Sequence, residues 1–375
     1  MTVSNLIRRL PGVLVLLLFA SGVCGQNDPV RCGAPDGSRV GLNGAACAIT
    51  TAVPFLLIAP DSRSGALGEA GVAINNSPAA LHWNPSILAF SEKQFGFSLN
   101  YSPWLRALGI PDINLAYLPA YYNFGPRGGV LSGGITFFSL GDINLTDQVG
   151  NPIGTINPAE FAISTAYARQ VTDNFSAGVS LRYVHSNLTG ATTIGGLSTR
   201  PGQSFAGDLH MFYTKDFVFQ RRTDMNFSWG LNISNLGAKM NYTNTAERDF
   251  MPANLRLGYA LRIDLDEYNS FAFTNDFNKL LVPFSNNPAD DATKSVVEGA
   301  LASFNDAPGG FSEELTGYFY EDPLKGNRKF ATLGAAIRFN VFTLDLAYLI
   351  SIRRNHPLAN TLRFSLSFEF GEVKK

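Results

Sequence analysis

A strict alternation of side chains along unusually long segments constrains the fold of this chain most. In residues 175–186 the odd positions are mostly bulky and apolar, and the even positions are mostly small, polar or charged. Residues 226–233, 255–264 and 362–370 repeat the pattern. Period two places each set of side chains on its own face of a β-sheet. A soluble sandwich would also alternate, but strands of globular sheets usually have about five or six residues. Segments of about ten to twelve residues fit tilted membrane-spanning strands instead.

The same pattern gives the number and the order of the strands. It predicts twelve strands, near residues 95–103, 112–123, 130–139, 159–169, 175–187, 203–214, 225–235, 254–265, 269–279, 330–339, 341–351 and 360–370. Short connections such as 125–129 and 266–268 alternate with long ones, of which 280–329 is the longest. Short periplasmic turns and long external loops are typical of bacterial outer-membrane proteins. The sequence therefore predicts an all-β protein with a transmembrane antiparallel β-barrel over residues 95–371.

Composition supports a sheet that faces lipid. The chain contains 29 Phe, 13 Tyr and 36 Gly, and only 16% of its residues are charged. After residue 25, no segment has the roughly eighteen consecutive apolar residues of a transmembrane helix. Without residues 1–25, which contain two arginines and no acidic residue, 27 basic residues stand against 30 acidic ones, a net charge of −3. This charge balance lacks the excess of basic residues that is typical of nucleic-acid binding. The predicted non-protein partner is the lipid bilayer.

The N-terminus predicts export. A basic pair, Arg8 and Arg9, precedes an apolar stretch of about eleven residues, which is too short to span a bilayer. Small residues follow and suit cleavage after Gly25, so residues 1–25 are predicted to be a signal peptide. Lipidation at Cys24 is the alternative. The expected location is the outer membrane.

Two cysteines remain in the predicted mature chain. Cys32 and Cys47 both lie before the first strand, within a predicted periplasmic N-terminal segment, residues 26–48. Because the periplasm is oxidising, we expect them to form a disulfide. Closing so short a loop would contribute about 3 kcal/mol. The alternative is a pair of free thiols in a mobile segment.

Apolar residues gather in two predicted external loops, 102–112 and 280–316. Exposed apolar patches commonly mark partner surfaces. The residues assigned to partner binding on this ground are Trp104, Leu105, Leu108, Ile110, Leu280, Leu281 and Phe284. The alternatives are side chains that dip into the membrane interface and loops that pack on each other.

The sequence contains no recognisable catalytic arrangement. It has no G-x-S-x-G, H-E-x-x-H or phosphate-binding loop, and no paired-cysteine metal spacing. His82, in the run His82-Trp83-Asn84-Pro85, is the most suggestive of four scattered histidines, but Asn-Pro commonly begins a turn. We therefore predict no catalytic, cofactor-binding or metal-binding residues, no cofactor and no enzymatic activity.

Several long runs resemble the PorV family, also called LptO, of the type IX secretion system of Bacteroidota. Residues 49–90 read ITTAVPFLLIAPDSRSGALGEAGVAINNSPAALHWNPSILAF and resemble the opening of that family. Further similar runs are YSPWL at 101–105, FSLGDINLTD at 138–147, NISNLGAKMNY at 232–242, NKLLVP at 278–283, SFNDAPGGFSEEL at 303–315, KGNRKFATLG at 325–334 and HPLANTLRFSLSF at 356–368. The resemblance covers nearly the whole mature chain.

The resemblance implies both a fold and a role. The implied fold is similar to the long-chain fatty-acid transporter barrels, with fourteen strands and a plug-like N-terminal segment, residues 49–94 here. The implied role is to collect cargo with C-terminal secretion domains from the giant translocon barrel and deliver it to the cell-surface sortase or attachment complex. The alternatives are a channel for hydrophobic molecules and a factor in lipopolysaccharide O-deacylation.

The sequence departs from the family pattern at one place. Leu315-Thr316 leads directly into residues 317–321, where the family has a further strand and part of its hairpin partner. We therefore expect twelve full strands, with residues 317–321 as a stub or as part of the external loop. Loss of two strands as a pair keeps the in-and-out parity. An open sheet and a closed barrel of twelve strands both stay as alternatives. An open edge in lipid would leave unpaired backbone groups, each of which costs roughly several kcal/mol.

Overall fold

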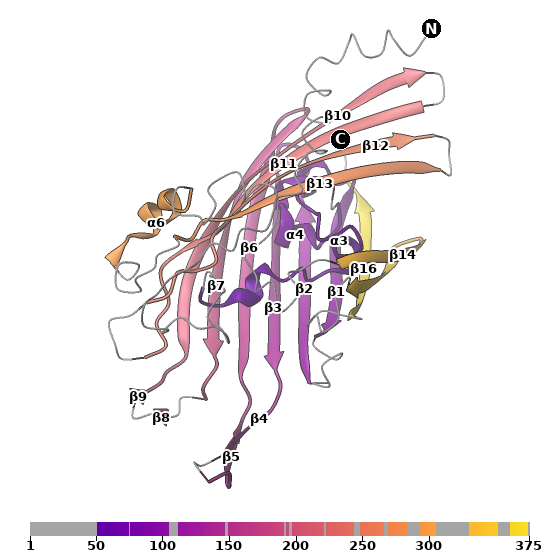
Figure 1. The fold of residues 1–375 in the computed structure, drawn as a ribbon. Coiled ribbons are helices and arrows are strands. Elements are labelled where there is room, and N and C mark those ends of the chain that lie inside the picture. Colours follow the sequence, from indigo (N-terminus) through magenta and orange to yellow (C-terminus); the bar gives the residue numbers. More distant parts are fainter. Residues whose placement is uncertain are drawn as a thin grey trace, which may run out of the picture.

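The computed structural model contains a twelve-stranded antiparallel sheet that curves around the N-terminal part of the chain (Figure 1). Its strand order is β13-β12-β11-β10-β7-β6-β3-β2-β1-β16-β15-β14. The structure describes residues 51–74, 76–104, 112–146, 149–190, 193–194, 197–220, 223–243, 248–265, 269–283, 293–304, 330–351 and 361–373.

The twelve strands of this sheet confirm the twelve predicted ones. They are β1 (Lys93–Pro103), β2 (Ile113–Asn123), β3 (Val130–Leu140), β6 (Ala159–Thr172), β7 (Phe175–Asn187), β10 (Gly202–Gln220), β11 (Thr223–Gly237), β12 (Asn254–Asp264), β13 (Ser270–Leu280), β14 (Phe330–Phe339), β15 (Phe342–Ser351) and β16 (Thr361–Glu372).

Strands β10 and β11 are longer than predicted. β7 pairs with β10 only as far as Tyr213, but β10 and β11 continue to pair with each other beyond that point. There Lys215 lies opposite Phe227 and Asp216 opposite Asn226. The charged residues interrupt the apolar alternation on which the prediction depended, yet they do not interrupt the backbone hydrogen bonds. The hairpin therefore extends past its neighbours.

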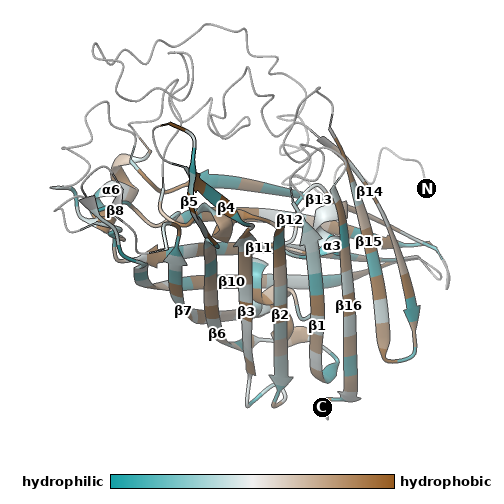
Figure 2. Cartoon of the chain, turned by 90° about the horizontal axis from the view of Figure 1, so that it is seen from below, coloured by the Kyte–Doolittle hydropathy of each residue, from teal (hydrophilic) through white to brown (hydrophobic). Residues whose placement is uncertain are grey.

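The sheet is apolar outside and polar inside. On β7, Leu181 is 68% exposed, whereas its neighbours Ser180 and Arg182 are buried. Figure 2 shows the resulting alternation of hydrophobic and hydrophilic bands along the strands. This arrangement is the reverse of a soluble protein, in which charged residues are seldom buried and large apolar ones usually are. It is the arrangement expected when the outer face of the sheet contacts lipid.

The two ends of the sheet carry different connections. At one end the turns are short: only two residues join β14 to β15, and Asn340 adopts a left-handed conformation there (φ 53°), as such hairpin turns require. The other end, the external end of the predicted topology, carries the long loops. They contain the hairpins β4 (Ile143–Thr146) with β5 (Pro152–Ile156) and β8 (Thr193–Ile194) with β9 (Leu197–Ser198), and the helix α6 (Val296–Ala302). Figure 1 shows β4 and β5 projecting beyond the sheet.

The predicted plug lies inside the curve of the sheet. We call residues 51–92 the plug, without residue 75, which lies outside the described ranges. It contains the short helices η2 (Pro54–Leu57), α3 (Ser62–Ala66), α4 (Ala80–Trp83) and η3 (Pro85–Phe90). Pro54 and Pro85 begin the two 3-10 helices, because proline fixes a helical φ and its missing N–H is not needed in a first turn. Figure 1 shows α3 and α4 within the concavity of the sheet.

Strands β13 and β14 are the two edges of the sheet. Within the described ranges they do not pair with each other, so the sheet is open on this side. We call this opening the seam. Residues 317–321, the predicted stub, lie outside the described residues, and their conformation stays a prediction.

None of the helices in the described part of the chain is long and apolar enough to cross a membrane.

Candidate functional site

Asn84 joins two parts of the plug to the wall of the lumen. Its Nδ2 atom donates hydrogen bonds to the carbonyl oxygens of Val72 (3.0 Å) and Met211 (2.8 Å). Its Oδ1 atom accepts a hydrogen bond from the backbone N–H of Ser86 (3.1 Å) and so caps η3. The side chain is fully buried. The Asn-Pro pair predicted to form a turn therefore also fastens the plug to β10.

Trp83 is enclosed by polar groups from three elements. Its indole Nε1–H donates to Oδ1 of Asp61 (2.6 Å), and its carbonyl oxygen accepts from Nδ2 of Asn232 on β11 (2.7 Å). The guanidinium of Arg256, on β12, lies 4.4 Å from the centre of the indole ring. A cation over an aromatic face is attracted by the ring quadrupole, and more strongly when both are out of water. The lumen-facing arginine thus gains a partner that alternation alone did not reveal.

A buried serine and histidine also meet between plug and wall. The Oγ atom of Ser86 lies 2.7 Å from Nδ1 of His210, and Oγ of Ser176 donates to the carbonyl oxygen of Ser86 (2.7 Å). A hydroxyl beside an imidazole can be an activated nucleophile. Both Ser86 and His210 are buried, with at most 1% exposure. The contact therefore acts as a further attachment of the plug to β7 and β10.

His82 is held neutral by its surroundings. The side chain packs edge-on against Trp83 (4.9 Å between ring centres) and Tyr117 (6.3 Å). Burial, followed by the positive charges of Arg256 and Arg182, lowers the pKa of His82 well below its ordinary value of 6.5. Protonating it would place a third charge between two arginines.

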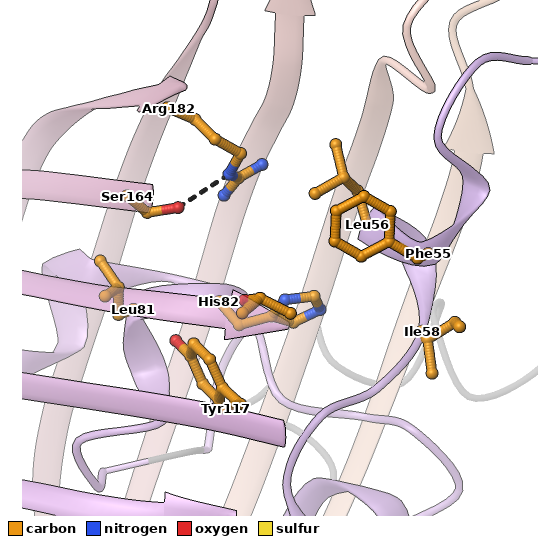
Figure 3. A pocket seen from close by; sticks show the side chains of 9 residues that line it. Phe55, Leu56, Ile58, Leu81, His82, Tyr117, Ser164 and Arg182 are labelled. Carbon is orange, nitrogen blue, oxygen red and sulfur yellow. Dashed lines mark hydrogen bonds between the residues drawn. The ribbon is translucent and has the colours of Figure 1, made fainter. Parts of the chain in front are cut away.

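Arg182 organises the small cavity beside His82 (Figure 3). Its guanidinium donates to Oγ of Ser164 (2.9 Å) and to Oδ2 of Asp208 (3.0 Å), and also to Oδ1 of Asn235. Arg182 and Asp208 are both buried. A buried charge is tolerated when it is paired and hydrogen-bonded. Here Asp208 supplies the opposite charge, and each of the three guanidinium nitrogens donates a hydrogen bond.

The cavity itself has room for about one water molecule. Its volume is about 10 Å³, near the minimum that one water needs. It is lined by Phe55, Leu56, Ile58, Leu81, His82, Tyr117, Thr136, Ser164 and Arg182. Figure 3 shows the apolar side chains of the N-terminal segment facing the polar side chains of His82 and Arg182. Beside His82, the described residues of plug and wall therefore leave room for about one water and not for a larger ligand.

A larger cavity lies at the end of the sheet with short turns. Its volume is about 1170 Å³, and its lining includes Lys93, Pro126, Gln170, Asp264 and Arg338 near the short-turn ends of the strands. Acidic and basic side chains both line it. In the predicted topology this cavity opens toward the periplasm and is bounded above by the plug.

Apolar packing dominates at the external end. Phe55 and Leu56 of η2 pack with Ile113 and Phe138 in a buried cluster, which we call the rim cluster. Trp104 packs edge-on against Phe138 (5.9 Å between ring centres). Its indole N–H is buried and has no hydrogen-bond partner within the described residues. Trp104 is thus half-buried rather than fully exposed.

The expected exposure of Leu280 and Leu281 is wrong. Each is only 7% exposed. Leu280 packs with Phe250 and Val282, and Leu57 of the plug packs against them. Here the alternative interpretation, in which the loops pack on each other, holds. Because both side chains are buried, exposure no longer supports their assignment to partner binding, which stays a prediction.

The remaining predicted site residues lie outside the described residues. These are Leu105, Leu108, Ile110, Phe284, Cys32 and Cys47. The partner-binding role and the disulfide stay predictions.

Helix α6 presents an apolar surface that the sequence analysis missed. Ser295 and Glu298 form a capping box at its start, a recognisable local signal for a helix. Gly299 faces Phe250, because a Cβ there would lie 2.8 Å from that ring. Val297 and Leu301 are 70% and 67% exposed, and their spacing of four residues puts them on one face.

Within the described ranges, no group of three or more His, Cys, Asp or Glu side chains is arranged to hold a metal ion.

Comparison with known proteins gives one family match. The sequence model described as "Type IX secretion system protein PorV" matches residues 43–287. No curated protein matches the chain.

Several solved structures are distantly similar. The Pseudomonas putida toluene transporter TodX is 13% identical, with a TM-score of 0.41, and the match covers 83% of this chain and 99% of TodX. A Pseudomonas aeruginosa FadL homologue is 12% identical (TM-score 0.36; 87% and 100% covered). LpxR from Salmonella typhimurium is 10% identical (TM-score 0.37; 73% and 100% covered). Likeness this distant carries no argument about function.

Proposed function

Because this chain belongs to the PorV family of type IX secretion system proteins, we propose that it collects cargo from the translocon at the outer membrane. The cargo carries C-terminal secretion domains, and the protein delivers it to the cell-surface attachment complex. The family match is the single observation that carries this proposal. The location follows from the family together with the apolar outer face of the sheet.

The contacts of the plug favour a scaffold over a conduit. Side chains of β7, β10, β11 and β12 contact the plug directly through Ser176, His210, Asn232 and Arg256. The cavity beside His82 has room for only about one water. A scaffold needs a rigid body that presents its loops to partners, and a plug fastened to several strands favours one.

The external end offers the surface for partners. Val297 and Leu301 project from α6, which is anchored by Gly299 on Phe250. Trp104 packs against the rim cluster, and its indole N–H has no hydrogen-bond partner among the described residues. Burying an aliphatic side chain of this size contributes about 1.5–3 kcal/mol, and a Trp beside aliphatic residues suits a binding hot spot. We infer that the translocon or the secretion domain of the cargo docks here.

The experiment that tests the proposal is a pull-down of the tagged protein from solubilised outer membranes of the native host. We expect the translocon barrel and cargo with C-terminal secretion domains to co-purify. We also expect a deletion strain to retain cargo that the complemented strain delivers to the cell surface. Normal cargo delivery in the deletion strain would contradict the proposal.

The two alternative functions remain distinguishable by direct assays. Uptake of radiolabelled fatty acid by cells with and without the protein tests the hydrophobic channel. Mass spectrometry of lipopolysaccharide from the same strains tests O-deacylation. The buried Ser86–His210 contact gives the second alternative no support, because a substrate could not reach it. We propose that the protein is not an enzyme.

A further inference from the structure

One stretch of the plug contacts strands on both sides of the seam. We call residues 66–72 the strap. At its first end, Oγ1 of Thr332 on β14 donates to the carbonyl oxygen of Ala66 (2.7 Å). At its last end, the backbone N–H groups of Gly71 and Val72 donate to Oδ2 of Asp276 on β13 (2.8 and 2.9 Å). β13 and β14 are the two edge strands of the sheet.

The strap closely approaches the backbone of the edge strand β14 on one side and of β12, the neighbour of the edge strand β13, on the other. A Cβ at Gly334 of β14 would lie 2.2 Å from Cβ of Ala66. On the other side, a Cβ at Gly258 of β12 would lie 2.5 Å from Cγ1 of Val72. Glycine at these two positions is what allows the strap to approach each wall so closely.

The middle of the strap is fixed as well. Gly68 and Glu69 both have positive φ, 72° and 67°, and this conformation is uncommon for a residue other than glycine. Glu69 accepts a hydrogen bond through Oε1 from Nη2 of Arg363 on β16 (2.9 Å). Arg363 is 2% exposed. The ion pair holds the turn in a shape that the backbone alone would not prefer.

We propose that the strap is a tie across the seam, which holds β13 and β14 at a fixed separation from the luminal side. In the described part of the chain neither edge has another strand to pair with. The strap therefore supplies a connection that hydrogen bonds between strands provide elsewhere in the sheet. Consequently the plug cannot leave the lumen without releasing the edges. This inference does not depend on the proposed function.

The separation of the two edges can be measured with a pair of spin labels. Phe273 on β13 and Ile337 on β14 both point outward, with 43% and 63% exposure, and both lie toward the short-turn ends of their strands. Each is changed to cysteine and labelled, in a background in which Cys32 and Cys47 are serine. Double electron-electron resonance on the full-length protein in nanodiscs then reports the distance distribution.

The hydrogen bonds at both ends of the strap are removed together by D276A on β13 and T332V on β14; we call this double substitution the cut variant. We expect the distances to become longer and the distribution to broaden. The control is S228A on β11, which is not an edge strand. It removes a comparable plug contact, the hydrogen bond from Oγ of Ser228 to the carbonyl oxygen of Ala73 (2.9 Å). The control should leave the distribution unchanged.

An unchanged distribution in the cut variant would overturn the proposal. So would equal broadening in the control, because the effect would then belong to the plug as a whole. If the double variant does not assemble, T332V alone is measured, since valine keeps the shape of threonine and removes only the donor to Ala66. The same two outcomes then decide.

Discussion

The plug–wall interface and the external rim hold the same N-terminal segment by opposite means. Deep in the lumen the contacts are polar and directional, as at Asn84, which bonds to Val72 and Met211. At the rim the contacts are apolar, as between Phe55 and Phe138, whose rings stack 6.2 Å apart. There the indole donor of Trp104 is unused within the described residues.

The difference separates structural from adaptable contacts. A buried hydrogen bond fixes one arrangement of its two groups, because any shift leaves a donor or an acceptor without its partner. Apolar groups of suitable size can repack at lower cost. The interior therefore suits a permanent scaffold, and the rim suits a surface that changes its neighbours when a partner binds.

The largest stability effect should come from Arg182→Met. The change leaves Asp208 buried without its ion pair, which typically costs about 3–5 kcal/mol. We expect loss of most of the folded, heat-modifiable protein in outer-membrane fractions. Adding Asp208→Asn should restore part of the loss, because the orphaned charge is removed. If the single variant remains as heat-modifiable as the parent, the interior does not depend on this pair.

Asn84→Ala should have the next largest effect. The carbonyl oxygens of Val72, which is buried, and of Met211 lose this donor, and a buried acceptor without a partner costs about 1–3 kcal/mol. We expect a lower unfolding temperature and a plug more sensitive to protease. Asn76→Ala is the matched control, because Asn76 is an exposed plug residue. Equal effects of the two variants would contradict a special role of Asn84.

His82 should make stability fall in mild acid. Its pKa is lowered in the folded protein, so the unfolded chain binds more protons just below the ordinary value of 6.5. The contribution of neutral His82 is complete above that pH and is lost as the pH falls toward the folded pKa. We expect the unfolding temperature to decrease below pH 6.5, and less so in His82→Gln. Parallel pH profiles of the two proteins would exclude this assignment.

The smallest stability effect should come from the double change Val297→Ser and Leu301→Ser on α6. Exposed positions usually contribute within about 0.5 kcal/mol, so assembly should be normal. Cargo delivery and co-purification of partners should nevertheless decrease. Ile143→Ser with Ile153→Ser on the β4–β5 hairpin is the control for exposed apolar residues of an external loop. Wild-type cargo secretion by the α6 variant would show that the docking surface lies elsewhere at the external end.

The strands could be predicted from the sequence because the division between lipid and lumen acts on every residue. Alternation predicted all twelve strands. It did not predict the far ends of β10 and β11, where Lys215 and Asp216 continue the pairing outside the alternating region. The signal for α6 was local, the Ser295 and Glu298 capping box, and could have been found.

The site could be predicted far less well. Burial of Leu280 depends on Phe250, which is distant in sequence. The polar attachments depend on which lumen-facing residue meets which turn of the plug, as when Arg256 covers Trp83. Alternation shows that a strand residue such as Arg256 faces the lumen, but it does not show which plug residue it contacts. The seam likewise follows from the pairing of whole strands, which no short motif records.

The closeness of plug and wall also bears on assembly. A Cβ at Gly230 of β11 would lie 2.1 Å from the carbonyl oxygen of Val72, so at this point the backbones of plug and wall meet with no side chain between them. We expect the N-terminal segment to be in place while the later strands are added around it. A chain without residues 51–92 should then form a sheet of different curvature.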